Sequence, residues 1–163
     1  MMRRPRAADK PLPFVRAPRQ ASRYQPLMAA FETSVTIRFE DADPAGIVFY
    51  PRAIAQAHGA VEDLIRQTEI GWDGWFANRN LAAPVRHAEA NFLAPMRAGE
   101  MLKARAYVES LGDTSVTFAV EFSGTGGETR ARIRTVHVLV DRATTKPVPL
   151  TPELRRALES FKA

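Results

Sequence analysis

The fold is decided by residues 39–51, which read FEDADPAGIVFYP and separate two segments with different hydrophobic periods. In residues 31–40, apolar and polar side chains largely alternate, and this period of two residues predicts a half-buried strand. One face of that strand carries Phe31, Thr33, Val35, Ile37 and Phe39. After the stretch, apolar side chains recur at helical spacing from Ile54 to Ile65, and Pro51 suits a first helical turn because no amide proton is needed there. We therefore predict a strand, a turn over residues 41–46, and an amphipathic helix that ends before Gly71.

Beyond this helix the period returns to two. Strands are predicted over residues 81–92 with a break near Pro84, then over residues 101–111, 115–123 and 129–141. A final helix is expected to begin with Thr151 as its N-cap. One long helix and a run of antiparallel strands predict an α+β fold, in which the sheet wraps around the helix.

Composition narrows the class of protein. The chain has 163 residues, which suits one domain. The absence of cysteine excludes disulfides, a cysteine nucleophile and iron–sulfur or zinc–thiolate sites, and with three histidines we expect no metal centre. No apolar run approaches the ~18 residues of a membrane span, so no membrane is expected as a partner. Because no secretory signal is recognisable, we expect a cytoplasmic location.

Residues 1–30 differ from the rest of the chain. They carry seven Lys or Arg, one acidic residue and five prolines, and therefore account for more than the whole net charge of +5. We predict a disordered basic extension over residues 1–30 and one folded domain over residues 31–163. Because that domain is close to neutral, no nucleic acid is expected as a partner. A chain that truly starts at Met28 is an alternative.

The segment from Asp41 to Gly46 has two interpretations. Asp, Pro and Gly are ordinary turn residues, so the segment can be structural. It also leads into a helix N-terminus, where free amides can stabilise an oxyanion and a nearby carboxylate can attack a carbonyl or deprotonate water. Residue types alone favour the turn, whereas the adjoining apolar run and helix favour chemistry.

The order Asp-x-Asp-Pro-x-Gly-aliphatic-aliphatic-aromatic-Tyr in residues 41–50 strongly resembles the signature of the 4-hydroxybenzoyl-CoA thioesterase family, which are hot-dog-fold acyl-CoA thioesterases. Residues 91–100 and 111–115 support the resemblance, which covers about residues 31–145. It implies a hot-dog fold and hydrolysis of an aryl-CoA or a short- or medium-chain acyl-CoA. It also implies that no cofactor is used, and that homodimers or homotetramers carry their active sites at subunit interfaces.

The resemblance also implies roles for residues. The catalytic carboxylate falls on Asp43 and the oxyanion contact on the backbone N–H of Tyr50. Gly46 is expected to let the backbone approach the thioester, while Asp41 matches a position that we interpret as a turn and N-cap residue. The substrate-binding set implied by the resemblance is Gly46, Ile47, Val48, Phe49 and His58.

Two positions depart from the family pattern. His58 falls where hydroxybenzoyl-specific members carry an acidic residue that meets the ring hydroxyl, which argues against 4-hydroxybenzoyl as the acyl group. Basic residues that some members place around residues 112–114 are missing, so the CoA phosphates are expected at Arg86, Arg97 or a face with Arg130, Arg132 and Arg134.

Other candidates have plainer explanations. His87 and Glu89 can form a proton-transfer pair, although a structural cross-strand pair is the more ordinary arrangement. His137 is expected to be a strand residue without chemistry. Trp72, Trp75 and Phe76 are expected to form an apolar lid after the helix.

Two alternative functions remain. An acyl-thioester dehydratase would need a histidine and an acid close to the substrate, for which His87 and Glu89 are the available pair. A non-enzymatic acyl-CoA-binding module is the other alternative.

Overall fold

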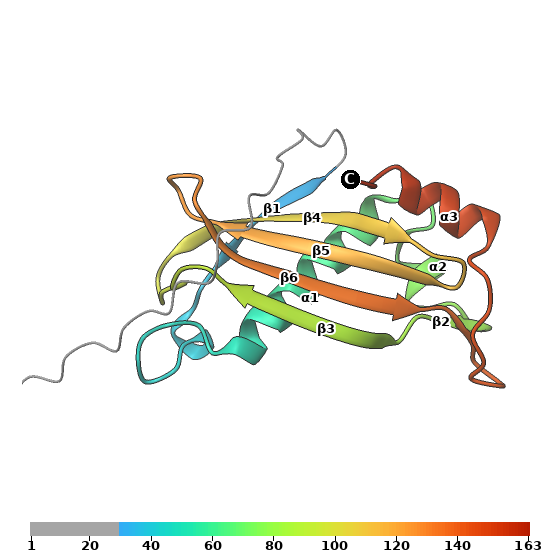
Figure 1. Ribbon diagram of the computed structural model, residues 1–163, viewed down its shortest axis with the longest axis horizontal. Helices are drawn as coiled ribbons and strands as arrows, with labels where there is room; N and C mark the ends of the chain where they lie inside the picture. The colour runs from blue at the N-terminus through green and yellow to red at the C-terminus, as the bar shows by residue number, and fades with distance from the viewer. Residues whose placement is uncertain (1–29) are drawn as a thin grey trace, which may run out of the picture.

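A computed structural model describes residues 30–163, so the predicted extension lies almost entirely outside the described residues. Its main feature is a five-stranded antiparallel sheet in the order β1-β4-β5-β6-β3 (Figure 1). The strands are β1 Phe31–Thr36, β3 Val85–Phe92, β4 Met101–Leu111, β5 Ser115–Ser123 and β6 Thr129–Val138. The predicted α+β class is confirmed.

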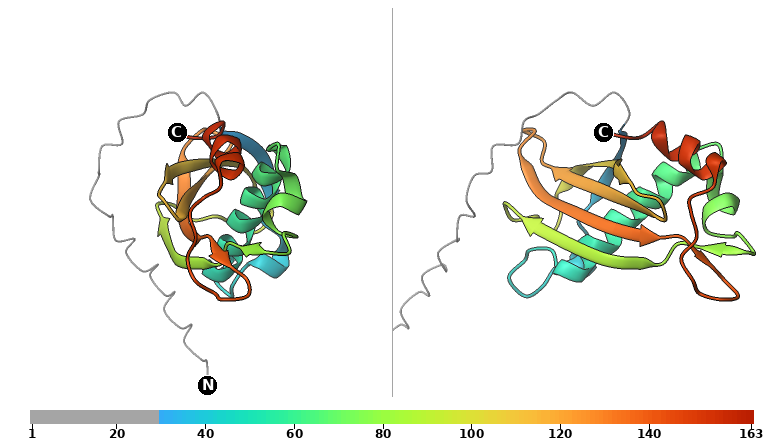
Figure 2. Two further views of the ribbon diagram at one scale, coloured as in Figure 1. Left: turned by 90° about the vertical axis from the view of Figure 1, so that its right-hand side faces the viewer. Right: turned by 45° about the vertical axis from the view of Figure 1, so that its right-hand side comes forward.

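The long helix α1, Tyr50–Gln67, lies against the concave face of the sheet, which curves around it (Figure 2). Its buried stripe is Ala53, Ala57, Ala60, Val61, Leu64 and Ile65. Alanine at three of these positions lets the helix backbone come close to the sheet. Inward-facing residues of β5, including Phe118 and Phe122, are fully buried opposite it. Burying each such side chain stabilises the fold by about 1.5–3 kcal/mol.

The convex face of the sheet is covered by ion pairs. Arg132 contacts Glu109 at 2.7 Å, Arg134 contacts Glu89 at 2.8 Å and Arg130 contacts Glu128 at 2.8 Å. Burial under these side chains, beside Glu121, raises the pKa of Tyr107 to about 12. The three arginines predicted on one face are therefore each matched by a carboxylate.

Shorter elements close the two ends of the molecule. They are the 3-10 turn η1 Phe39–Asp41, helix α2 Gly71–Trp75, the strand pair β2 Leu81–Ala82 and β7 Val140–Asp141, and helix α3 Pro152–Glu159. Thr151 caps α3 as predicted, since its hydroxyl accepts the Leu154 N–H at 3.2 Å. No helix within residues 30–163 is long and apolar enough to cross a membrane.

The sequence-based boundaries were wrong at the first strand. Strand β1 ends at Thr36 and not near residue 40, and Phe39 is 92% exposed although the alternation predicted it on the buried face. The physical reason is local. The carboxylate of Asp41 accepts the Arg38 N–H at 2.9 Å, which bends the chain into η1 and removes it from the sheet.

Candidate active site

The loop between η1 and α1 is closed by its own backbone. Ala42 and Val48 form an antiparallel bridge, and the Asp43 N–H donates to the Ile47 carbonyl at 2.8 Å. The Gly46 N–H donates to the Asp43 carbonyl at 2.9 Å. Gly46 has φ +74°, a conformation in which L side chains are strained, so this turn requires glycine. The loop therefore presents Asp43 in a defined position.

The Asp43 side chain is half-buried, and only one of its two carboxylate oxygens accepts a hydrogen bond from the described residues. Its Oδ1 accepts the Ala45 N–H at 2.8 Å, which fixes the side chain in an Asx turn. Its Oδ2 accepts no hydrogen bond from the described part of the chain. One carboxylate oxygen is thus held while the other can take part in chemistry.

The first turn of α1 leaves one amide free. Pro51 has no N–H, while the N–H groups of Arg52 and Ala53 both donate to the Phe49 carbonyl, at 2.8 and 3.3 Å. Among residues 30–163, the Tyr50 N–H has no acceptor. It lies at the positive end of the helix dipole, where a developing oxyanion is stabilised.

Apolar side chains surround this loop, and they differ in exposure. Phe49 and Tyr50 are 48% and 61% exposed, with ring centroids 5.3 Å apart. Ile47 is half-buried. The side chain of Val48 is in the core, at 7% exposure, so the structure separates it from the other predicted substrate-binding residues.

His58 lies on α1 eight residues after Tyr50, which corresponds to about 12 Å along the helix. Its Nε2 is 3.4 Å from Glu62, and its ring lies 6.2 Å from the rings of both Phe76 and His137. Within one chain, His58 is therefore not brought next to Asp43.

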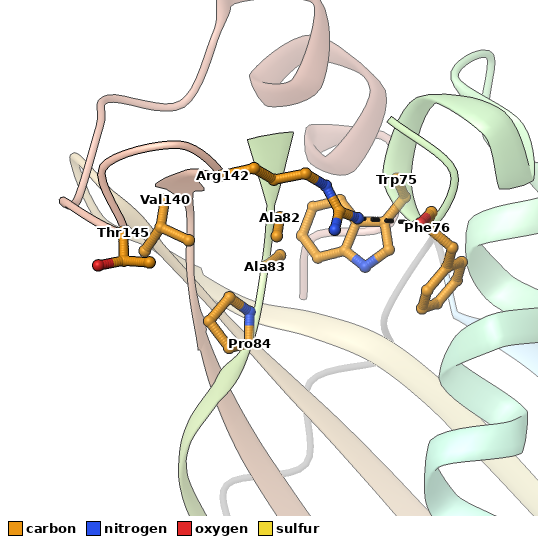
Figure 3. A pocket seen from close by; sticks show the side chains of 8 residues that line it. All are labelled: Trp75, Phe76, Ala82, Ala83, Pro84, Val140, Arg142 and Thr145. Atoms are coloured by element: carbon orange, nitrogen blue, oxygen red, sulfur yellow. Dashed lines mark hydrogen bonds between the residues drawn. The ribbon is translucent and has the colours of Figure 1, made fainter. Parts of the chain in front are cut away.

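A cavity of about 430 Å³ is lined by residues in and next to α2, β2 and β7 (Figure 3). Helix α2 and strand β2 lie at the other end of α1 from the loop (Figure 1). The cavity is lined by Trp75, Phe76, Ala82, Ala83, Pro84, Val140, Arg142 and Thr145. Arg142 crosses its rim and donates from a terminal nitrogen to the Phe76 carbonyl at 3.5 Å (Figure 3). Its Nε also donates to the carbonyls of Asn78 and Leu81, both at 2.8 Å. Trp75 and Phe76 thus line a cavity, which the prediction of an apolar lid had not located.

His137 is a buried structural residue beside that cavity. Its Nδ1–H donates to the Ala83 carbonyl at 2.9 Å, which leaves Nε2 to accept from the Thr135 hydroxyl at 3.2 Å. Burial lowers the pKa of His137, and the nearby His58 adds to this effect. The arrangement agrees with a strand residue that has no chemical role.

His87 and Glu89 lie on the convex face, turned away from α1, with 3.5 Å between Nε2 and Oε2. Arg134, and after it His87, holds the pKa of the Glu89 carboxyl below its usual value. An ionised, Arg-paired glutamate on an open surface is a structural partner, and this geometry does not favour dehydratase chemistry.

Among the described residues there is no group of three or more His, Asp or Glu side chains that could hold a metal ion.

Two residues of the site were not predicted from the sequence. They are Arg52 and Gln56, whose side chains reach Asp41. Because they are four residues apart at the start of the predicted helix, they lie on one helix face, and this spacing could have indicated that both side chains reach the aspartates before the helix.

Comparison with known proteins places these features in context. The sequence model of the thioesterase-like superfamily matches residues 37–158. A 1,4-dihydroxy-2-naphthoyl-CoA hydrolase of Trichodesmium erythraeum is 30% identical over 128 residues, covering 77% of this chain and 93% of that protein. A crystal structure of a Jannaschia thioesterase superfamily protein has TM-score 0.75 at 25% identity, covering 86% and 99% of the two chains. A 1,4-dihydroxy-2-naphthoyl-CoA thioesterase from Synechocystis has TM-score 0.72 at 22% identity, covering 80% and 96%.

Proposed function

The chain belongs to the thioesterase-like superfamily, and on that premise we propose that it hydrolyses an aryl-CoA thioester at the loop that carries Asp43. The family and the hot-dog fold expected from residues 39–51 are confirmed, and with them the class of thioester hydrolase. The observation that supports the proposed site is that one loop carries a carboxylate oxygen on Asp43 and leads to an amide N–H on Tyr50, neither of which has a hydrogen-bond partner within residues 30–163.

In the proposed reaction the thioester carbonyl oxygen accepts the Tyr50 N–H. Asp43 Oδ2 either attacks the carbonyl carbon, giving a mixed anhydride that water then hydrolyses, or removes a proton from the attacking water. In both routes the C–S bond breaks, the thiolate of CoA leaves and takes up a proton, and the acyl group departs as a carboxylic acid. The helix dipole stabilises the negative charge on the carbonyl oxygen in the tetrahedral intermediate.

The acyl group we propose is aromatic. The cavity is lined by Trp75 and Phe76 and is large enough for one or two fused rings. Relatives of this chain act on 1,4-dihydroxy-2-naphthoyl-CoA, a bicyclic aryl thioester. We therefore propose a substrate between benzoyl-CoA and naphthoyl-CoA in size.

The cavity and the loop lie far apart in one chain, and a homodimer would bring them together. Strand β3 is at the sheet edge, and its ends carry the exposed apolar side chains Val85, Phe92 and Leu93. Strand β3 begins beside the cavity at Pro84, and the segment after it reaches the loop, where Met96 accepts the Val48 N–H. Antiparallel pairing of two β3 strands would set each cavity beside the partner's loop. We propose this dimer, alone or as half of a tetramer.

The same pairing offers cations for the CoA phosphates. Arg97 is exposed beside the loop, where its neighbour Ile47 forms a bridge with it. Arg86 is exposed at the start of β3. Neither side chain has a carboxylate partner among residues 30–163. We propose that Arg97 and the partner subunit's Arg86 flank the same thioester.

The activity is tested by free-thiol release from acetyl-, hexanoyl-, benzoyl-, 4-hydroxybenzoyl- and 2-naphthoyl-CoA. The proposal expects turnover that is fastest with the aryl thioesters. Turnover confined to straight-chain thioesters would reject the aryl acyl group, and no thiol release from any of them would reject the function.

The shared site is tested by co-expressing Asp43→Asn chains with Ala83→Trp chains, in which the new side chain fills the cavity. Each mixed dimer would contain one site with an intact Asp43 and an intact cavity. We expect the mixture to hydrolyse aryl-CoA clearly faster than either variant alone. If both parents are inactive and the mixture is equally inactive, the dimer proposal fails while the hydrolase proposal stands.

A further inference from the structure

We propose that Asp41 is a positioning residue, whose buried carboxylate holds the Asp43 loop in register with the N-terminus of α1. The inference rests on the proposed function and deepens it. The sequence interpretation had given Asp41 a turn and N-cap role, and the structure shows a wider one. The Asp41 carboxylate contacts Arg38, Arg52 and Gln56, and its proposed action is through the geometry of Asp43 and the Tyr50 amide.

The carboxylate of Asp41 is the centre of a small polar network. Oδ2 accepts the Arg38 N–H at 2.9 Å and the Gln56 Nε2–H at 3.0 Å, while Oδ1 lies 3.2 Å from Arg52 Nε. The side chain is only 9% exposed. A buried carboxylate is tolerated when a cation and hydrogen-bond donors compensate for its lost hydration, and here both are present.

The main chain of Asp41 completes the attachment. Its carbonyl accepts the N–H of Phe49, the N-cap of α1, at 2.7 Å. Asp41 therefore contacts the chain before the loop at Arg38, the N-cap of α1 at Phe49, and the second turn of the helix at Gln56. The catalytic loop, residues 42–48, lies between these attachment points.

Gln56 shows that the carboxylate dominates this network. Its amide nitrogen points to Asp41, and its Oε1 is buried with no hydrogen-bond donor among the described residues. An unpaired buried oxygen is unfavourable, so the orientation is maintained by the charge of Asp41. The bond to Asp41 is thus what ties this helical side chain to the loop.

An asparagine at position 41 would keep the shape and lose the function of the carboxylate. Whichever way its amide group turns, the NH2 would face either the Arg52 guanidinium or the Arg38 N–H, which are both donors themselves. The loop would then shift relative to α1. Because misplacement of a reacting group by about 1 Å can reduce the rate 10²-fold, the effect should appear in kcat.

The test compares Asp41→Asn and Gln56→Leu with a matched control, Val120→Ala. Val120 is buried in β5, so this control destabilises the fold and leaves the network intact. Thermal melting measures stability, and thiol release from the best aryl-CoA gives kcat and KM per folded enzyme. We expect Asp41→Asn to lower kcat about 10- to 100-fold with KM within about twofold, and Val120→Ala to keep kcat.

The double variant Asp41→Asn/Gln56→Leu should be no slower than the worse single variant, because both substitutions break one network. Fully additive losses, an unchanged kcat in Asp41→Asn, or an equal loss in Val120→Ala would each overturn the positioning role. In all three cases the wild-type enzyme still hydrolyses thioesters. An inactive wild-type chain is the separate outcome that rejects the proposed function, and the positioning role with it.

Discussion

The two ends of helix α1 are built on different principles. At its N-terminus, backbone hydrogen bonds close the loop, one of them fixes Asp43, and the aromatic rings of Phe39 and Phe49 are exposed. At its C-terminus, Trp75 and His137 pack in an aromatic cluster beside a cavity of about 430 Å³. One end carries the groups that are proposed to react, and the lining of the cavity at the other end contains no carboxylate.

In the proposed dimer, each chain would supply one of these two parts to each site. Hydrogen bonds are directional and fix atoms to within tenths of an ångström, which suits the groups that are proposed to react. Apolar packing fixes shape with less directional control, which suits selection of an acyl group.

The largest effect is expected at the reactive end. Asp43→Asn should lower kcat for aryl-CoA hydrolysis about 10²- to 10⁴-fold, the usual contribution of a general base, because the amide neither attacks nor accepts a proton. The fold should be unaffected, since the new Oδ1 can still accept the Ala45 N–H. Thiol release measures the rate. Asp113→Asn, in the exposed turn after β4, is the control and should retain wild-type kcat.

A smaller and selective effect is expected at the cavity end. Phe76→Ala should raise KM for 2-naphthoyl-CoA about 10-fold, or about 1.4 kcal/mol, because an aromatic wall is lost. KM for acetyl-CoA should stay within about twofold. Steady-state kinetics with 2-naphthoyl-CoA and acetyl-CoA measure the two KM values. Equal changes for the two thioesters would show that the cavity does not select the acyl group.

The cavity end should also give the protein a dependence on pH. Burial lowers the pKa of His137 below its ordinary value of 6.5, so the unfolded chain binds a proton more readily than the folded chain. The stabilisation is complete above pH 6.5 and is lost as the pH falls below it. Urea unfolding between pH 7.5 and 5.5 should show this decline. His137→Gln should reduce the slope, whereas the exposed His87→Gln should leave it unchanged.

The smallest effect is expected at the exposed aromatic residue of the reactive end. Phe39→Ala should change the free energy of unfolding by less than about 0.5 kcal/mol, because the ring is 92% exposed and contributes little to the core. Urea unfolding with far-ultraviolet circular dichroism measures the change. A loss above about 1 kcal/mol would mean that Phe39 is packed in solution, against a surface that a single chain does not supply.

Much of the fold follows from local pattern. The stripe from Ala57 to Ile65 identifies α1, and the period-two segments identify β4, β5 and β6 within a residue or two, except that the last predicted strand is divided after Val138. The order of types in residues 41–50 identifies the family. These features are readable because helical period, strand period and turn chemistry are properties of neighbouring residues.

Tertiary structure decided what depends on distant residues. It buried Asp41 and matched the arginines of β6 with glutamates of β3, β4 and the turn before β6. It also built the cavity from three separate segments, residues 75–76, 82–84 and 140–145. Sequence spacing carries no record of such contacts, because they form only when strands and helices that lie far apart in the chain pack together.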